Sequence, residues 1–360
     1  MESLQTIINE FTVIIRTAAE SKTPIIIRGS GSKDFYGNQV VGENNGSLDV
    51  TTYSGIVDYE STELVVTARA GTRLADLEAA LHKQGQMLAF EPPYFGTTAT
   101  LGGCVATGLS GPRRVSAGAV RDFVLGARLL DGQGNDLRFG GQVMKNVAGY
   151  DVSRLMVGAM GTLGVLLEVS LKVLPLPQAE LTVQMQMNEA AAIEKMNVWA
   201  GKPLPISATC FFDDLLTFRL SGAELAVRAA HTKLGGEVLV TGSAFWQSVC
   251  EQTHNFFQTQ QSVWRLSIPS TTQTLFLPGQ QLVEWNGALR WFVNNEAVDA
   301  ETIRIVAKKA GGHATLFRNH KLSAGAFQPL DPNMMKIHQR LKQKFDPAGI
   351  FNPGRLYPEL

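Results

Sequence analysis

Three glycine-rich segments hold the residues best suited to chemistry. The first is RGSGSK at residues 28–33, which follows an apolar run that predicts a strand at residues 24–28. After such a strand, the backbone N–H groups of a small-residue loop can converge on an anion. Serine hydroxyls would add donors there, and Arg28 or Lys33 would add charge. The spacing matches neither GxGxxG nor the phosphate-binding loop of NTPases. Taken alone, the segment also has a structural interpretation as a tight turn.

The other two segments lie further along the chain. Residues 97–111, TTATLGGCVATGLSG, carry no charge and little side-chain bulk, which suits a bed for a large planar or phosphorylated ligand. A tightly packed turn is the alternative. The third segment joins KNVAGYD at residues 145–151 to GAMGTLGV at residues 158–165. Because 15 of the 35 glycines fall within residues 95–165, we expect the backbone there to approach a ligand closely.

The overall composition excludes several classes of protein. The 360 residues include 32 basic and 32 acidic side chains, and this balance argues against nucleic-acid binding and against electrostatic membrane docking. The cysteines Cys104, Cys210 and Cys250 form no CxxC pair, so we expect a reducing compartment and no iron–sulfur cluster in this chain. The apolar runs are far shorter than the ~20 residues needed to cross a bilayer. We therefore expect a cytoplasmic protein with no transmembrane segment.

The elements that would position the glycine segments divide the chain in two. Apolar spacing predicts an amphipathic helix at residues 3–21, and the PLP sequence at residues 175–177 marks a boundary. Beyond it, residues 180–241 follow the order βαββαβ of a ferredoxin-like unit, and a second, weaker unit of this kind spans residues 262–318. A last helix is predicted at residues 332–345. The other expected elements are strands at 64–69, 86–90, 122–131, 136–139 and 163–174 and helices at 73–84 and 151–157.

Several motifs together resemble one known family. TLGGCVATGLSG at residues 100–111, AGYDVSRLMVGAMGTLGV at residues 148–165 and the tail FDPAGIFNPGR at residues 345–355 are similar to the FAD-binding domain of the vanillyl-alcohol-oxidase (PCMH-type) flavoproteins, as is the first glycine segment. Their order and spacing match over nearly the whole chain. Residues 108–126 and 140–156 look most like the smaller FAD-binding subunits of bacterial glycolate oxidases.

The resemblance implies an α+β fold, made of a two-part PCMH-type FAD-binding domain and a ferredoxin-like α+β cap. We expect residues 1–177 to form the FAD-binding domain and residues 178–330 to form a cap that contacts substrate or a partner. Residues 331–360 would return to the FAD-binding domain.

The resemblance also implies which residues hold FAD. The first loop would bind the pyrophosphate, the second segment would line the pyrophosphate, ribityl chain and isoalloxazine, and the third would meet the adenine side. The family often tethers FAD to a histidine in the first loop, which this chain lacks, so we expect non-covalent FAD. The cofactor-binding candidates are Arg28, Gly29, Ser30, Gly31, Ser32, Lys33, Pro92, Thr97, Thr100, Leu101, Gly102, Gly103, Ala106, Thr107, Gly111, Gly161, Thr162, Gly164, Val165 and Asn352.

Lys145 and Arg318 are the candidate catalytic residues, and no metal site is expected. Lys145 matches the family's lysine before the Gly-Tyr-Asp turn, although a solvated loop lysine is the alternative. Arg318 could pair with a substrate carboxylate, but an interdomain salt bridge is the more common fate of such an arginine. Related dehydrogenases carry a metal-binding HxGDGNxH segment, which the stretch around His313 lacks. Arg113 and Arg114 could contact FAD phosphate or a partner protein, and a solvated pair is the default interpretation.

These features favour an FAD-binding subunit of a glycolate (D-2-hydroxyacid) dehydrogenase. Such a subunit would take hydride from glycolate to give glyoxylate, and would pass electrons to a larger FAD-binding sister subunit and an iron–sulfur subunit. A second hypothesis is a non-catalytic subunit that holds FAD for electron transfer or as a scaffold, which the missing metal motif favours. A third is a stand-alone flavoenzyme such as the cell-wall enolpyruvyl reductase, against which the tail argues. Partners could also bring this cytoplasmic chain to the inner face of the membrane.

Overall fold

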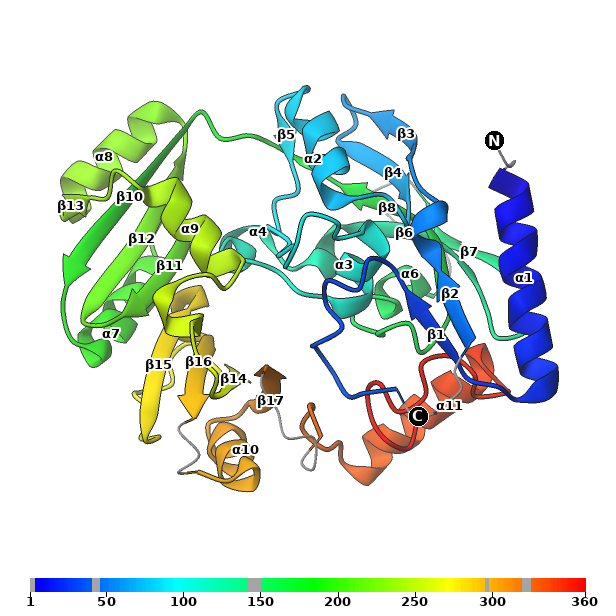
Figure 1. Ribbon diagram of the computed structural model, residues 1–360. Helices are drawn as coiled ribbons and strands as arrows, with labels where there is room; N and C mark the ends of the chain where they lie inside the picture. The colour runs from blue at the N-terminus through cyan, green and yellow to red at the C-terminus, as the bar shows by residue number, and fades with distance from the viewer. Residues whose placement is uncertain (1–3, 41–45, 142–149, 295–297, 319–324) are drawn as a thin grey trace.

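The computed structural model describes residues 4–40, 46–141, 150–294, 298–318 and 325–360. They form two parts, drawn on the right and left of Figure 1. The N-terminal part comprises residues 4–175 together with the C-terminal segment, and the cap comprises residues 179–318. Among the described residues, no helix combines the length and the apolar character needed to span a membrane.

The N-terminal part contains three sheets, one of which is the antiparallel pair of β5 and β9. A parallel pair joins β1 to β2, and an antiparallel five-stranded sheet has the order β3-β4-β8-β6-β7. Its strands are β1 (Ile25–Arg28), β2 (Gly46–Asp49), β3 (Ile56–Glu60), β4 (Val65–Arg69), β5 (Gln86–Met87), β6 (Val124–Leu130), β7 (Asp136–Gly140), β8 (Val165–Lys172) and β9 (Leu174–Pro175). Its helices are α1 (Leu4–Ser21), α2 (Leu74–His82), α3 (Leu101–Thr107), α4 (Arg114–Ala117), α5 (Val120–Phe123) and α6 (Val152–Leu155).

The central strand β8 is buried on both faces because it lies between two hydrophobic cores. Val165 and Leu167 pack against the apolar face of α1. Leu166 and Leu171 pack in a second core, to which α2 and α3 contribute. This explains why the strand is a nearly continuous apolar run rather than an alternating pattern.

The cap is built on one antiparallel eight-stranded sheet of order β13-β10-β12-β11-β15-β16-β14-β17. Its first half has the predicted βαββαβ order. Its elements are β10 (Ala179–Gln186), α7 (Glu189–Ala200), β11 (Ile206–Phe212), β12 (Leu215–Gly222), α8 (Glu224–Leu234), β13 (Glu237–Val238), α9 (Gly242–Cys250), β14 (Ser262–Ser267), β15 (Gly279–Glu284), β16 (Leu289–Asn294), α10 (Ala300–Lys309) and β17 (His313–Arg318).

The prediction of a second βαββαβ unit in residues 262–318 is wrong. The described residues 268–278 join β14 to β15 without a helix, so the order is three strands, one helix and one strand. One of these strands, β15, pairs with β11, and the four strands thereby extend the first unit into a single sheet. Two short strands of the N-terminal part, β2 and β3, were also not expected from the sequence.

The C-terminal segment returns to the N-terminal part, where it lies beneath β1 in Figure 1. Helix α11 (Pro332–Phe345) has the predicted bounds. After it, the Ile25 N–H donates to the Ile350 carbonyl (2.7 Å) and the Asn352 N–H donates to the Ile25 carbonyl (3.1 Å). Phe351 forms a parallel bridge to Ile25, so the tail runs alongside β1.

Candidate cofactor site

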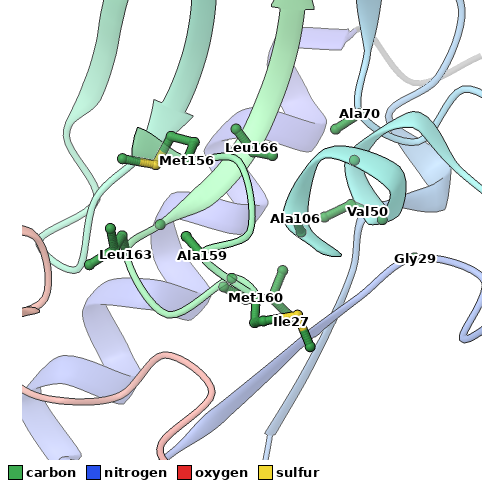
Figure 2. Close-up of a pocket in the computed structure, with 14 residues that line it drawn as sticks. Ile27, Gly29, Val50, Ala70, Ala106, Met156, Ala159, Met160, Leu163 and Leu166 are labelled. Atoms are coloured by element: carbon green, nitrogen blue, oxygen red, sulfur yellow. The ribbon is translucent and has the colours of Figure 1, made fainter. Parts of the chain in front are cut away.

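Two neighbouring cavities between β1, α3 and the start of β8 form what we term the trough. The larger, about 410 Å³, is lined by loop 28–34, the second half of α3, Asn352 and Arg355. The smaller, about 70 Å³, is apolar, with Met156, Leu163 and Leu166 on one side and α3 on the other (Figure 2). Both cavities are lined by Ile27, Gly29, Gly103, Ala106 and Met160.

Loop 28–33, at the end of β1, lines the larger cavity and contains hydrogen-bond donors that have no acceptor among the described residues. The amide N–H groups of residues 29–33 donate to no acceptor among the residues that the structure describes. The Ser30 hydroxyl is buried and also lacks a partner there. Amides and hydroxyls that have no internal acceptor can donate to a bound anion. A diphosphate is a ligand of that chemistry, and the loop therefore fits the pyrophosphate of FAD.

The two cations of this loop are already engaged within the protein. Arg28 forms an ion pair with Asp34 (2.5 Å), and both side chains are about half exposed. Lys33 is buried, and its Nζ donates to the Tyr94 carbonyl (3.1 Å) and lies over the Phe95 ring (5.7 Å). Burial lowers the Lys33 pKa. Backbone amides rather than free cations are thus the main donors available to an anion.

The second wall of the trough is α3, in which Gly102 and Gly103 serve different structural roles. Thr100 caps the helix by accepting the Gly103 N–H (3.2 Å). A Cβ at Gly102 would lie 2.9 Å from the Ala70 Cβ, so glycine there lets α3 pack on the end of β4. At Gly103 the nearest atom would be the Thr100 hydroxyl, at 3.2 Å, and the rest of the space belongs to the cavities. Ala106 and Thr107 complete this wall.

The third wall is the turn that enters β8. Gly161 and Gly164 line the smaller cavity, and Gly161 has a φ of +70°, which favours glycine. Met156, Ala159, Met160 and Leu163 were not predicted, and their only sequence signal is that they are neighbours of these glycines.

Asn352 joins the first wall of the trough, formed by β1 and loop 28–33, to the third wall, formed by the turn that enters β8. Its Oδ1 accepts the Ile27 N–H (2.9 Å), and its Nδ2 donates to the Met160 carbonyl (2.7 Å). The side chain also lines the larger cavity. Arg355, which sequence reasoning missed, lies next to it in the same wall.

Six predicted cofactor residues lie outside the trough. Leu101, Thr162 and Val165 are buried in the protein interior. Pro92 and Thr97 line a separate cleft of about 1000 Å³ between α2 and the cap. Gly111 packs against the Glu91 carbonyl and the Cys250 thiol, and its own carbonyl accepts the Trp285 indole N–H (3.1 Å).

Only one of the two candidate catalytic residues lies in the part of the chain that the structure describes. Lys145 lies outside the described residues. The Arg318 guanidinium lies over the rings of Phe35 (4.6 Å) and Phe95 (5.5 Å), and burial lowers its pKa. In the described ranges, no group of three His, Cys, Asp or Glu side chains is placed to hold a metal ion.

Aromatic side chains fill the contact between the N-terminal part and the cap. Phe317 of β17 lies 5.6 Å from Phe35, 4.9 Å from Tyr36 and 4.9 Å from Trp291 between ring centroids. A cavity of only about 20 Å³ is lined by some of these residues and by Glu284. Such a volume holds about one water molecule. Burial raises the pKa of Glu284 to about 7, and its carboxylate accepts the Trp291 indole N–H (2.7 Å).

A buried ion network also crosses this contact. Arg113 pairs with Glu91 (3.2 Å) and with Glu180, and Arg219 pairs with Glu91 (2.7 Å). Arg114 lies over the Trp285 ring at 4.3 Å. The default interpretation of Arg113 and Arg114 as a solvated pair is therefore wrong, because both pack between the two parts.

Comparisons with known proteins identify the family of the chain. A family model described as an FAD binding domain matches residues 6–140, which include the first two walls. The chain is 51% identical to glycolate oxidase subunit GlcE of Escherichia coli (strain K12) over 96% of both chains. It is 30% identical to glycolate oxidase subunit GlcD of Bacillus subtilis (strain 168), over 55% of this chain and 42% of that protein.

The fold is shared with solved structures. An alkyldihydroxyacetonephosphate synthase superimposes with a TM-score of 0.67 at 18% identity, over 95% of this chain and 73% of that one. The chain therefore belongs to the glycolate oxidase subunit GlcE family, within the flavoproteins that carry a PCMH-type FAD-binding domain.

Proposed function

We propose that this chain is an FAD-holding subunit of a complex that oxidises glycolate to glyoxylate. The single observation that carries the proposal is that loop 28–33, which lines a cavity of about 410 Å³, contains donors with no acceptor among the described residues. Glycolate as substrate is inferred from the relatives, both named glycolate oxidase subunits. When bound, FAD supplies the two-electron redox chemistry that oxidation of a 2-hydroxy acid requires.

The residues that would hold FAD lie on all three walls. The amides of residues 29–33 and the Ser30 hydroxyl would donate to the pyrophosphate. Gly103 and Gly161 leave room for the cofactor between the walls. The remaining trough candidates are Arg28, Thr100, Gly102, Ala106, Thr107, Gly164 and Asn352.

We propose that the cofactor is not covalently attached. Cys104 is the cysteine on α3, and burial raises the pKa of its thiol to about 12. A thiol with so high a pKa is a poor nucleophile near neutral pH. Histidine, the other common attachment residue, is absent from loop 28–33.

The partners we propose are a larger FAD-binding sister subunit of the GlcD kind and an iron–sulfur subunit that receives electrons. The word subunit in the names of the relatives supports an assembly. We also propose the domain limits 1–177, 178–330 and 331–360, and a cytoplasmic location with membrane association through partners.

A second candidate function differs in where glycolate is oxidised. The aromatic contact around Phe317 leaves little room for a substrate, and Arg318 stacks on Phe35 and Phe95. This packing favours an electron-transfer role in which the sister chain oxidises glycolate and this chain holds FAD.

Anaerobic mixing with glycolate distinguishes the two candidates. Bleaching of the visible flavin absorbance in the isolated, FAD-loaded chain would establish oxidation by this chain. Bleaching only after the sister subunit is added would support electron transfer. A chain that never retains flavin, alone or with its partners, would refute both.

A further inference from the structure

The C-terminal segment makes an unusual number of hydrogen bonds to the loops that form the trough. Two of its side chains, Asn352 and Arg355, line the larger cavity. Neither is used by the proposed function except as part of the lining, so their contacts merit a separate explanation.

Asn352 fixes the distance between two walls. Its amide bridges the Ile27 N–H of β1 and the Met160 carbonyl of the β8 turn, and the side chain is buried. A Cβ at Gly161 would lie 2.6 Å from the Asn352 Nδ2, so glycine there is what allows the bridge. Asn352 has a φ of +40°, a conformation that asparagine tolerates better than most residues.

Arg355 fixes the chain that follows loop 28–33. Its guanidinium donates to the carbonyls of Tyr36 (2.7 Å), Asn38 (2.9 Å) and Asp34 (3.1 Å). With these carbonyls turned toward Arg355, the course of the preceding loop is restricted. This restriction helps to keep the amides of residues 29–33 free to face the cavity.

Asn352 and Arg355, which we term the clamp, lie in a segment that is anchored by a buried ion pair. Lys342 of α11 pairs with Asp346 (2.7 Å) and donates to the carbonyls of Thr162 (2.9 Å) and Phe351 (2.7 Å). The Asp346 carboxylate accepts the N–H groups of Ile350 (3.1 Å) and Phe351 (2.7 Å). The tail is therefore held in place on both sides of the trough.

We propose that Asn352 and Arg355 are positioning residues that pre-form the FAD site by holding the first and third walls in their binding geometry. This inference rests on the proposed FAD-holding function. Pre-organised donors bind more tightly because less ordering is required on binding. Loss of either side chain should therefore weaken FAD binding even where the apoprotein remains folded.

Two matched pairs of variants test the proposal. Asn352→Gly removes the bridge while tolerating the positive φ, and Asn286→Gly is its control, since Asn286 in the cap has a φ of +56° and accepts a hydrogen bond from Thr209. Arg355→Lys removes the fork of donors, and Arg290→Lys is its control, because buried Arg290 donates to two carbonyls within the cap.

We expect about tenfold weaker FAD binding in both clamp variants and less than about twofold change in both controls, measured by quenching of flavin fluorescence. Hydrogen exchange in the apoprotein should accelerate in residues 28–38 and 158–164 in the clamp variants only. This second readout requires no bound flavin and separates positioning from general destabilisation. Should Arg355→Lys fail to fold, Asn352→Gly decides.

Equal FAD affinity in the wild type and the folded clamp variants, with only their melting temperatures lowered as in the controls, would overturn the proposal. If the wild-type chain itself bound no FAD, the proposed function would fail first and the clamp with it. The two failures are distinguishable because only the second affects the wild type.

Discussion

Polar groups in the trough differ from those at the aromatic contact between the N-terminal part and the cap in whether they have partners within the protein. In the trough, the amides of residues 29–33 and the Ser30 hydroxyl have no partner among the described residues. At the contact, Arg113 and Arg219 are paired with carboxylates, and the Gly111 carbonyl accepts the Trp285 indole. The amides of residues 29–33 thus lack an internal acceptor in the described part of the chain, whereas the named donors at the contact have one.

This difference distinguishes a region suited to binding a ligand from a region that holds the two parts of the protein together. Glycine-rich segments supply both regions, since Gly103 opens onto the trough while Gly111 packs against Glu91 and Cys250. A glycine excess therefore indicates close approach of the backbone, but it does not say whether a ligand or another chain segment approaches. The comparison predicts that changes at the contact will affect stability, whereas changes in the trough will affect FAD binding.

The largest effect is expected at the ion network. Arg113→Met removes a buried guanidinium and leaves the partly exposed carboxylates of Glu91 and Glu180 with fewer partners, so we expect a loss of about 3 kcal/mol in the free energy of unfolding. FAD affinity should be unchanged. Chemical denaturation measures the first and flavin fluorescence the second. Arg228→Met is the control, because its pair with Glu224 is exposed and should contribute less than about 1 kcal/mol. A large loss of FAD affinity in Arg113→Met would break the separation of the two regions.

The pH dependence of stability tests the same contact. Burial raises the pKa of Glu284 to about 7, with Arg265 opposing and Glu91 adding to the effect. The folded state then binds a proton more tightly than the unfolded state, so this group's contribution to stability is present at low pH. That contribution is lost as the pH rises from about 4.5 to above 7.

Glu284→Gln should remove this dependence, because the amide keeps an acceptor for Trp291 and cannot ionise. Relative to its stability at pH 5, we expect the wild type to lose about 2–3 kcal/mol more than the variant by pH 8. Denaturation curves across this range provide the measurement. Parallel pH profiles for the two proteins would show that Glu284 does not titrate as inferred.

In the trough, Gly103→Val should nearly abolish FAD retention. The valine methyl groups would occupy both cavities, and we expect affinity to fall at least about a hundredfold, or about 2.7 kcal/mol. The fold should survive, because among the described residues, apart from the backbone of α3 itself, the one atom within 4 Å of an added Cβ is the Thr100 hydroxyl at 3.2 Å. Flavin absorbance after gel filtration is the measurement. Gly201→Val in the cap, where the nearest atom is 3.8 Å away, is the control. Normal flavin loading of Gly103→Val would refute this placement of the site.

Much of the fold could be predicted because its signals are local. The limits of α11 and the βαββαβ order of residues 179–238 follow from apolar periodicity and from breaks at proline and glycine. The single cap sheet could not be predicted, since it depends on the pairing of β11 with β15 across a long sequence separation. Nor does the sequence predict that residues 268–278 lack a helix.

The residues of the candidate site also differ in whether the sequence could predict them. Gly29, Gly103 and Gly161 were identified because clustered glycines are visible in the sequence. Arg355 was missed because its acceptors are backbone carbonyls more than 300 positions earlier, and no sequence pattern encodes the direction of a carbonyl. Pro92 and Thr97 lie close in sequence to α3, but they face a different cleft because the chain turns before the helix begins.

The smallest effect, and the sharpest test of the comparison, is expected for Ser30→Ala. Because the Ser30 hydroxyl is buried without a partner, its removal should leave the apoprotein as stable as before or up to about 1 kcal/mol more stable. FAD binding should nevertheless weaken about fivefold, since one donor to the anion is lost. Ser207→Ala should destabilise the apoprotein and leave FAD affinity unchanged. Its hydroxyl accepts a hydrogen bond from Arg219 (2.8 Å), and it lies in the cap rather than in the trough. Melting of the apoproteins and flavin titration measure both quantities. If Ser30→Ala destabilised the apoprotein without changing FAD affinity, Ser30 would belong to the internally satisfied class and the trough would lose its defining feature.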